Sequence, residues 1–143
     1  MILMIDHYDS FVYNLVRYLR ELGEAVVVHH HDTLDIEAIA LLAPEAILFS
    51  PGPKRPEDAH LALQVLEAMY GEQPTLKQVP ILGICLGHQV ISHYFGGTVS
   101  PGHQPVHGKL SVVSHDGQGV FRDIPQLFRV TRYHSLIVQE THF

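Results

Sequence analysis

The single cysteine of this chain lies in a pattern that can make its thiol a nucleophile. Residues 83–89 have the sequence Gly-Ile-Cys-Leu-Gly-His-Gln, and Gly-x-Cys-x-Gly is typical of the sharp strand-to-helix turn called a nucleophile elbow. Glycines suit this turn because backbone and helix meet there with no room for a Cβ atom. The turn would place Cys85 at a helix N-terminus, whose dipole favours the thiolate, and would point the Leu86 amide at a developing oxyanion.

The alternative is that Cys85 is a small buried apolar residue, as many free cysteines are. Residues 50–53, Ser-Pro-Gly-Pro, form a stiff loop in which the Gly52 amide is a candidate second oxyanion donor, although a rigid turn without a ligand is also possible. Residues 132–136, Arg-Tyr-His-Ser-Leu, offer His134 as a candidate base. Nothing in the spacing orients this histidine, and the Ser-Leu pair after it can instead present backbone groups to a substrate.

Histidine is abundant, at 12 residues, but only residues 29–31 form a run. Alternation along a strand would split these side chains between two faces, so we expect a solvated strand end rather than a metal site. Metal, flavin and nucleotide signatures are absent, and Gly96-Gly97 indicates a helix stop rather than a phosphate loop. We therefore expect no metal and no cofactor in this chain.

The elements that would position these segments alternate between strand and helix. Apolar runs and capping signals predict strands at 1–5, 25–29, 46–49 and 79–84, and helices at about 10–22, 36–42, 56–69 and 86–95. Apolar strands separated by amphipathic helices predict an α/β fold with a parallel sheet covered on both faces. Beyond Gly97, short β-like runs at 109–113 and 127–131 predict an antiparallel extension at one edge of that sheet.

The composition favours a single globular domain over residues 1–143. Hydrophobic residues make up 46% and charged residues 17%, which is enough to bury a core. The net charge of −6 without a basic stripe argues against a nucleic-acid partner, and the apolar runs are too short for a membrane span. The N-terminus resembles a buried strand rather than a secretory signal. One cysteine cannot form an internal disulfide, so we expect a cytoplasmic setting.

The sequence resembles the class I (triad) glutamine amidotransferases, specifically the small subunits of anthranilate synthase and of aminodeoxychorismate (para-aminobenzoate) synthase. Five blocks carry the resemblance, in the family's order over essentially the whole chain. They are residues 1–11, 50–53, 83–89, 107–109 and 132–136. The resemblance implies a flavodoxin-like fold with a mostly parallel sheet.

The resemblance also implies a reaction. Cys85 would attack the amide carbon of L-glutamine, release ammonia and leave a glutamyl thioester that water hydrolyses. The backbone amides of Gly52 and Leu86 would form the oxyanion hole. The residues that would hold the glutamine are Gly52, Gln89, Ser135 and Leu136. Because residues 132–136 match a substrate-binding block, the resemblance weakens His134 as the base.

The family passes its ammonia to a chorismate-binding synthase large subunit, which also holds the magnesium that the parent synthases use. The partner therefore decides the product. Residues 128–136 lean slightly towards the para-aminobenzoate subunit, and some family members serve both pathways.

The chain departs from the family most clearly near its end. The family activates its cysteine with a His and a Glu from a Phe-His-Pro-Glu-type block, and no such block occurs before Phe143. The resemblance thus implies a C-terminally truncated domain, either as a fragment, as a natural truncation that no longer catalyses, or with His134 or His142 as a substitute base. Because acid–base help contributes about 10²–10⁴-fold, we expect weak or no glutaminase activity from this chain alone.

Two smaller departures lie beside the expected site: His7 stands where the family usually has Asn, and Lys54 stands where a small residue is common. Two further hypotheses stay open. One is a non-catalytic module of the same family that only binds the synthase subunit. The other is a different cysteine hydrolase on a similar sheet, against which Gly52, Gln89 and the Ser-Leu pair argue.

Overall fold

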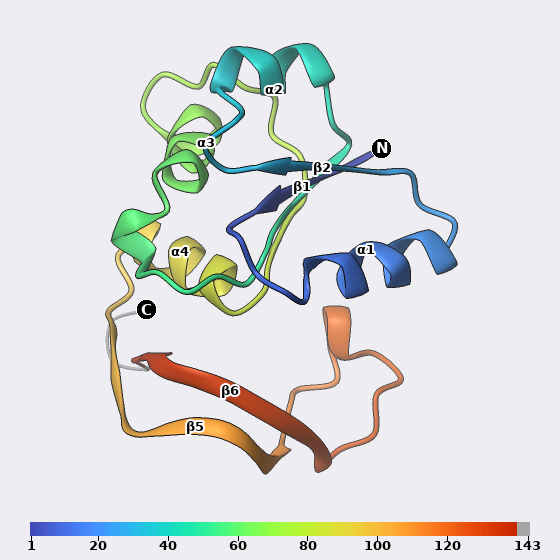
Figure 1. The fold of residues 1–143 in the computed structure, drawn as a ribbon, viewed down its shortest axis with the longest axis vertical. Coiled ribbons are helices and arrows are strands. Elements are labelled where there is room, and N and C mark those ends of the chain that lie inside the picture. The colour runs from blue at the N-terminus through green and yellow to red at the C-terminus, as the bar shows by residue number, and fades with distance from the viewer. Residues whose placement is uncertain (140–143) are drawn as a thin grey trace. The chain divides into compact units, whose positions relative to one another are not determined.

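The computed structural model describes residues 1–139, except the side chains of residues 103–105. These residues form two compact units. The first contains Met1–Val99 and the segment that begins at Val138, and the second contains Ser100–Ile137 (Figure 1). No helix among the described residues combines the length and the apolar character that crossing a membrane requires.

The first unit is built on a four-stranded sheet with the strand order β2-β1-β3-β4. Its strands are β1 (Ile2–Asp6), β2 (Val26–His30), β3 (Ala46–Phe49) and β4 (Ile81–Gly83). All three strand pairs are parallel. Because β1 lies between β2 and β3, the direction of winding reverses beside β1. In α/β sheets, ligands bind outside the carboxyl ends of the strands at such a switch point.

Helices cover both faces of this sheet, as the sequence predicted. They are α1 (Val12–Glu21), α2 (Ile36–Leu42), α3 (His60–Tyr70) and α4 (Leu86–Tyr94). Val12 and Val16 of α1 pack with Met4 and Leu48 on one face. The other three helices pack with alternate residues of the same strands, including Leu3, Ile5 and Phe49, on the opposite face. The period of two along a strand explains why one strand supplies both cores.

Two predicted elements are shorter than the sequence suggested. The helix expected at 56–69 begins as a 3₁₀ turn, Pro56–Asp58, and the α-helix begins only at His60, because Ala59 has a non-helical ψ of 59°. The strand expected at 79–84 begins at Ile81. Pro80 has no N–H to contribute to a strand ladder, although its carbonyl accepts a hydrogen bond from Ile47 at 3.0 Å.

The second unit corrects the expected edge extension. Its strands β5 (Val99–Val113) and β6 (Phe128–Val138) pair with each other as a separate two-stranded sheet, and their arrows run in opposite directions in Figure 1. A 3₁₀ turn, Gly119–Phe121, lies between them. Pro101 and Pro105 interrupt the donors along β5, which suits a strand paired along one edge only. The antiparallel strands were predicted, but not their separation from the parallel sheet.

Candidate active site

Cys85 occupies a strained turn between β4 and α4. Its backbone has φ 54° and ψ −106°, and positive φ is uncommon for a residue with a side chain. Such strain persists only where the surrounding structure enforces it. The amide of Gly87 donates to the carbonyl of Ile84 at 3.0 Å, and the amide of Gln89 donates to the carbonyl of Cys85 at 3.1 Å. The backbone therefore has the strand-turn-helix form of a nucleophile elbow.

The two elbow glycines are sterically required. A Cβ atom on Gly83 would lie 2.5 Å from the backbone nitrogen of His88, and one on Gly87 would lie 2.6 Å from the Cβ atom of Phe49. The start of α4 thus packs backbone to backbone against β3 and β4. This confirms the reason given above for glycine at both positions.

The thiol of Cys85 reaches the surface, yet its environment disfavours the thiolate. Partial removal of water by the surrounding protein raises the pKa of Cys85, and the nearby Asp9 carboxylate adds to this effect. A hydrogen bond from the Leu86 amide lowers the pKa but does not outweigh them. The helix terminus alone led us to expect a thiolate. The structure corrects this, so the thiol needs a base to react efficiently at neutral pH.

The loop of residues 50–53 lies against the first turn of α4. A Cβ atom on Gly52 would lie 2.7 Å from Leu86 Cδ2 and 2.7 Å from His7 Cβ, so Gly52 fits between these two residues. The two candidate oxyanion donors, Gly52 and Leu86, are therefore neighbours. Gln89 is buried on α4 with 7% of its surface exposed, one turn after Cys85. The fold brings these four predicted residues together at the carboxyl ends of β3 and β4.

The other two predicted residues, Ser135 and Leu136, lie on β6 in the second unit, and their role stays a prediction. Their neighbour His134 has both ring nitrogens engaged. Its Nε2 accepts a hydrogen bond from Arg132 Nε at 2.9 Å, and its Nδ1 lies 2.9 Å from the carbonyl oxygen of Leu136. Neither nitrogen is available to take a thiol proton in this arrangement. The other candidate base, His142, lies outside the described residues.

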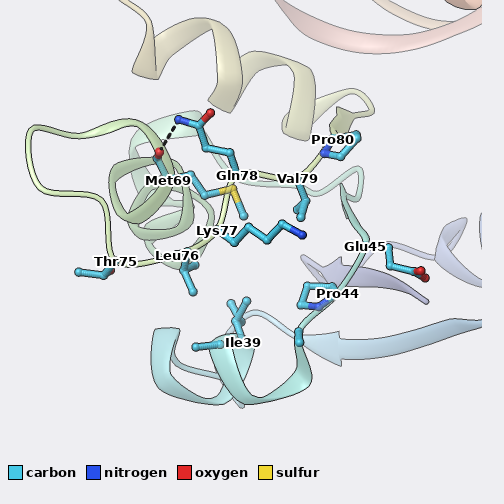
Figure 2. Close-up of a pocket in the computed structure, with 12 residues that line it drawn as sticks. Ile39, Pro44, Glu45, Met69, Thr75, Leu76, Lys77, Gln78, Val79 and Pro80 are labelled. Atoms are coloured by element: carbon cyan, nitrogen blue, oxygen red, sulfur yellow. Dashed lines mark hydrogen bonds between the residues drawn. The ribbon is translucent and has the colours of Figure 1, made fainter.

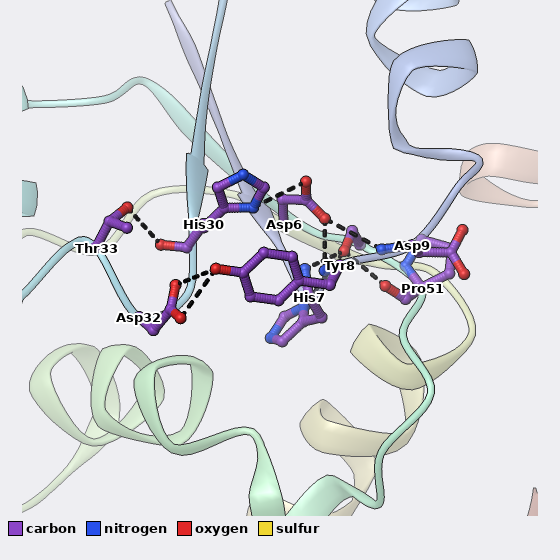
Figure 3. Close-up of polar contacts among 9 residues, drawn as sticks. Asp6, His7, Tyr8, Asp9, His30, Asp32, Thr33 and Pro51 are labelled. Atoms are coloured by element: carbon purple, nitrogen blue, oxygen red, sulfur yellow. Dashed lines mark hydrogen bonds and ion pairs between the residues drawn. The ribbon is translucent and has the colours of Figure 1, made fainter.

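The turn between β1 and α1 contributes site residues that the sequence reasoning did not assign (Figure 3). Asp6 is 3% exposed, and its Oδ1 accepts hydrogen bonds from the amides of Tyr8 at 2.7 Å and Asp9 at 3.3 Å. These bonds fold the turn, in which Tyr8 has a φ of 62°, and they bring the Asp9 carboxylate near the thiol. An aspartate directly after an apolar strand is the available sequence signal.

His7 connects this turn to the 50–53 loop. Its amide donates to Ser50 Oγ at 2.9 Å, and its Nδ1 lies 3.3 Å from the same oxygen. The hydroxyl of Ser50 in turn donates to the carbonyl of Pro51 at 2.7 Å. Burial of the ring, reinforced by His31, lowers the pKa of His7 to about 4 against the opposing effects of Asp6 and Ser50. His7 is therefore neutral at pH 7.

The histidine run at the end of β2 is not simply a solvated strand end, as we had expected. The ring of His31 stacks on His7 with centroids 5.4 Å apart, and His30 stacks on Tyr8 at 4.4 Å. The Tyr8 hydroxyl donates to Asp32 at 2.8 Å. These contacts attach the β1–α1 turn to the end of β2 (Figure 3). The described residues contain no group of three or more His, Cys, Asp or Glu side chains that could hold a metal.

A separate cavity of about 380 Å³ lies near the other end of the strands. Its lining includes Glu45, which precedes β3, and Pro80, which precedes β4. Figure 2 shows Lys77 among its apolar walls, and the Gln78 side chain donates to the Met69 carbonyl at 3.0 Å. None of the residues placed around Cys85 lines it, so this cavity is distinct from the candidate site.

Comparison with known proteins supports a specific family. The sequence matches the family described as "Glutamine amidotransferase class-I" over residues 3–143. It is 48% identical to anthranilate synthase component 2 of Azospirillum brasilense, over 97% of this chain and 68% of that protein. It is 45% identical to aminodeoxychorismate synthase component 2 of Escherichia coli (strain K12), over 97% of this chain and 71% of that protein. The chain thus spans about two thirds of these relatives.

Solved structures agree on the fold. A GMP synthase subunit from Thermoplasma acidophilum has a TM-score of 0.75 and 26% identity, over 97% of this chain and 66% of that one. A glutamine amidotransferase from Thermotoga maritima has a TM-score of 0.71 and 18% identity, over 96% of this chain and 61% of that one. The flavodoxin-like α/β prediction is confirmed.

Proposed function

Because the chain belongs to the class-I glutamine amidotransferase family, we propose that it is the glutamine-hydrolysing subunit of a chorismate-using synthase. One observation carries the proposal: the strained Cys85 elbow lies beside Gly52 and Leu86, at the carboxyl ends of β3 and β4. The names of its relatives, anthranilate synthase component 2 and aminodeoxychorismate synthase component 2, support the choice of synthase.

The proposed reaction begins when Cys85 Sγ attacks the side-chain amide carbon of L-glutamine. The amides of Gly52 and Leu86 donate to the oxyanion of the tetrahedral intermediate. The C–N bond then breaks, and the leaving nitrogen takes a proton and departs as ammonia. Water hydrolyses the resulting γ-glutamyl thioester, which releases glutamate and restores the thiol. Gln89, with Ser135 and Leu136 of β6, holds the glutamine in this scheme.

The raised pKa of Cys85 bears on how active the chain is by itself. A protonated thiol needs a base before it attacks, and the leaving ammonia needs an acid. His134 is engaged by Arg132 and Leu136 and does not fill this role. We therefore propose that the 143 residues alone have weak glutaminase activity or none.

The proposed partner is the chorismate-binding large subunit, which consumes the ammonia, and the proposed location is the cytoplasm. Relatives from both pathways match this chain at similar identity, 48% and 45%, so identity does not separate anthranilate from aminodeoxychorismate synthesis. Co-purification with each candidate large subunit decides between them. A chain that binds a large subunit but never reacts with glutamine would favour the non-catalytic alternative.

A chloromethyl ketone analogue of glutamine tests the proposed chemistry. We expect this electrophile to modify Cys85 once, as located by peptide mass spectrometry, and the Cys85→Ser variant to remain unmodified. An adduct on any other residue would rule out the proposed role of Cys85. Turnover of a peptide or ester substrate, with no response to glutamine, would favour a different cysteine hydrolase.

A further inference from the structure

We propose that His7 is a positioning residue, which fixes the 50–53 loop through Ser50 and so aims the Gly52 amide at the oxyanion. The inference rests on the proposed function, because the direction of that amide matters only if an oxyanion forms beside Cys85. His7 touches neither the thiol nor the substrate in this proposal. It acts through the loop.

The hydrogen bonds of Ser50 determine how the imidazole is used. A serine hydroxyl has one hydrogen, and that of Ser50 is donated to the Pro51 carbonyl at 2.7 Å. Its oxygen accepts the His7 amide at 2.9 Å. The contact between His7 Nδ1 and Ser50 Oγ at 3.3 Å can therefore be a hydrogen bond only if Nδ1 carries the hydrogen. His7 thus donates twice to one oxygen, once from the backbone and once from the ring.

The ring is held in one protonation state. With a pKa of about 4, the imidazole carries a single hydrogen at pH 7, and the contact with Ser50 assigns that hydrogen to Nδ1. The side chain is 96% buried by its 4% exposure, and Nε2 has no hydrogen-bond partner among the described residues. Protonation at Nε2 would bury a donor with nothing to accept it, which is costly.

Packing carries the effect of His7 to the reacting atoms. Gly52 lies so close to His7 that a Cβ atom there would be 2.7 Å from His7 Cβ and 3.2 Å from the His7 carbonyl oxygen. On its other side, Gly52 abuts the Leu86 side chain, whose backbone amide donates to the thiol. Loss of the bond between His7 and Ser50 would therefore let the loop shift against α4. Small displacements of an oxyanion donor have large effects on rate.

The test compares two reagents that modify Cys85 by different routes. In both, Sγ forms a bond to carbon and a halide leaves. The chloromethyl ketone analogue of glutamine forms an oxyanion on the way, whereas iodoacetamide is displaced directly. The variants are His7→Leu, which removes the ring donor, His7→Asn, whose side-chain amide can replace it, and Ser50→Ala, which removes the acceptor. Circular dichroism checks that each variant folds.

We expect His7→Leu to slow the ketone reaction about tenfold, consistent with the loss of one hydrogen bond that aligns an oxyanion donor. The iodoacetamide rate should stay within about twofold of wild type, and His7→Asn should restore most of the ketone rate. Ser50→Ala should resemble His7→Leu, and the double variant should be no slower than either. The Ser50→Ala result stands by itself if His7→Leu does not fold.

Equal slowing of both reagents would overturn the proposal, because it would indicate a general loss of structure or of thiol reactivity. Unchanged ketone rates in folded His7→Leu or Ser50→Ala would overturn it as well. A different failure belongs to the proposed function: wild-type protein that reacts with iodoacetamide at Cys85 but not with the ketone. That result would remove the premise of the positioning role together with the proposed reaction.

Discussion

At the scale of single residues, the reactivity of Cys85 depends on opposing local effects. The Leu86 amide stabilises the thiolate, while loss of solvent and the Asp9 carboxylate destabilise it, and together these two raise the pKa of the thiol. Asp9 also accepts a hydrogen bond from the Phe11 amide at 2.8 Å at the start of α1. Its charge and its structural role can be separated, because Asn retains the acceptor oxygen and loses only the charge.

The first prediction concerns this charge. We expect Asp9→Asn to lower the pKa of Cys85, so that the pH-rate profile for alkylation by iodoacetamide shifts to lower pH. Since the acceptor to Phe11 remains, the stability of the fold should change little. The control is Glu37→Gln on α2, which removes a carboxylate that does not contribute to the shift. An unchanged profile in Asp9→Asn would show that the carboxylate does not act on the thiol.

The sequence identified the residues whose chemistry is local and missed those that depend on distant contacts. The elbow around Cys85 follows from neighbouring glycines in one segment. The link between His7 and Ser50 depends instead on β1 pairing with β3, where Ile5 is opposite Phe49. No local pattern encodes that pairing. The balance that leaves Cys85 protonated also requires the position of Asp9, which only the folded turn determines.

At the scale of elements, the site is made by the ends of strands and the helices or turns that follow them. The sequence predicted α2 and β3 with the bounds observed, because Asp35 caps the helix by accepting from the Ala38 amide at 2.8 Å and β3 is an apolar run. It extended the helix at 56–69 through Ala59, where the backbone breaks. The pairing of β5 with β6 was also beyond it, since long-range strand pairing has no local signature.

A second prediction tests the close approach of α4 to β3. Gly87→Ala would force a Cβ atom against the backbone and side chain of Phe49, and overpacking of this kind typically costs about 1–3 kcal/mol. We expect a lower urea midpoint with an unchanged m-value. His88→Ala, at the exposed next position of the same helix, is the matched control and should have little effect. Equal stability of the two variants would contradict the close packing described here.

At the scale of the whole molecule, the described chain consists of two units, and the first contains Cys85, Gly52, Leu86 and Gln89. Its sheet order places the carboxyl ends of β1, β3 and β4 side by side. This explains why segments distant in sequence, from His7 to Gln89, meet in one region. Within this unit β4 is paired only with β3, and Leu82 on it is 48% exposed. The single-domain assignment for 1–143 stays a prediction.

A third prediction concerns stability against acid. The pKa of His7 is about 4 in the folded state, below its ordinary value of 6.5, so the unfolded chain binds more protons between these values. Stability from His7 is complete above pH 6.5 and is lost as the pH falls towards 4, by about 2–3 kcal/mol at pH 4.5. His7→Asn should lack this dependence.

Urea unfolding at pH 7 and pH 4.5 measures the effect. The difference between the two pH values should be smaller in His7→Asn than in wild type, while His88→Asn, which replaces an exposed histidine, should behave like wild type. If all three proteins lose the same stability on acidification, His7 is not buried in its neutral form.

The most direct test of the central claim is whether glutamine binds over Cys85. We would follow the alkylation of Cys85 by iodoacetamide at increasing concentrations of L-glutamine, with D-glutamine as the control, and locate the modified residue by mass spectrometry. Binding requires no acid or base, so the measurement applies even to a chain of low activity. The account predicts that L-glutamine slows the modification to a saturating limit and that D-glutamine does not. A Cys85 modification rate that is the same at every L-glutamine concentration would contradict it.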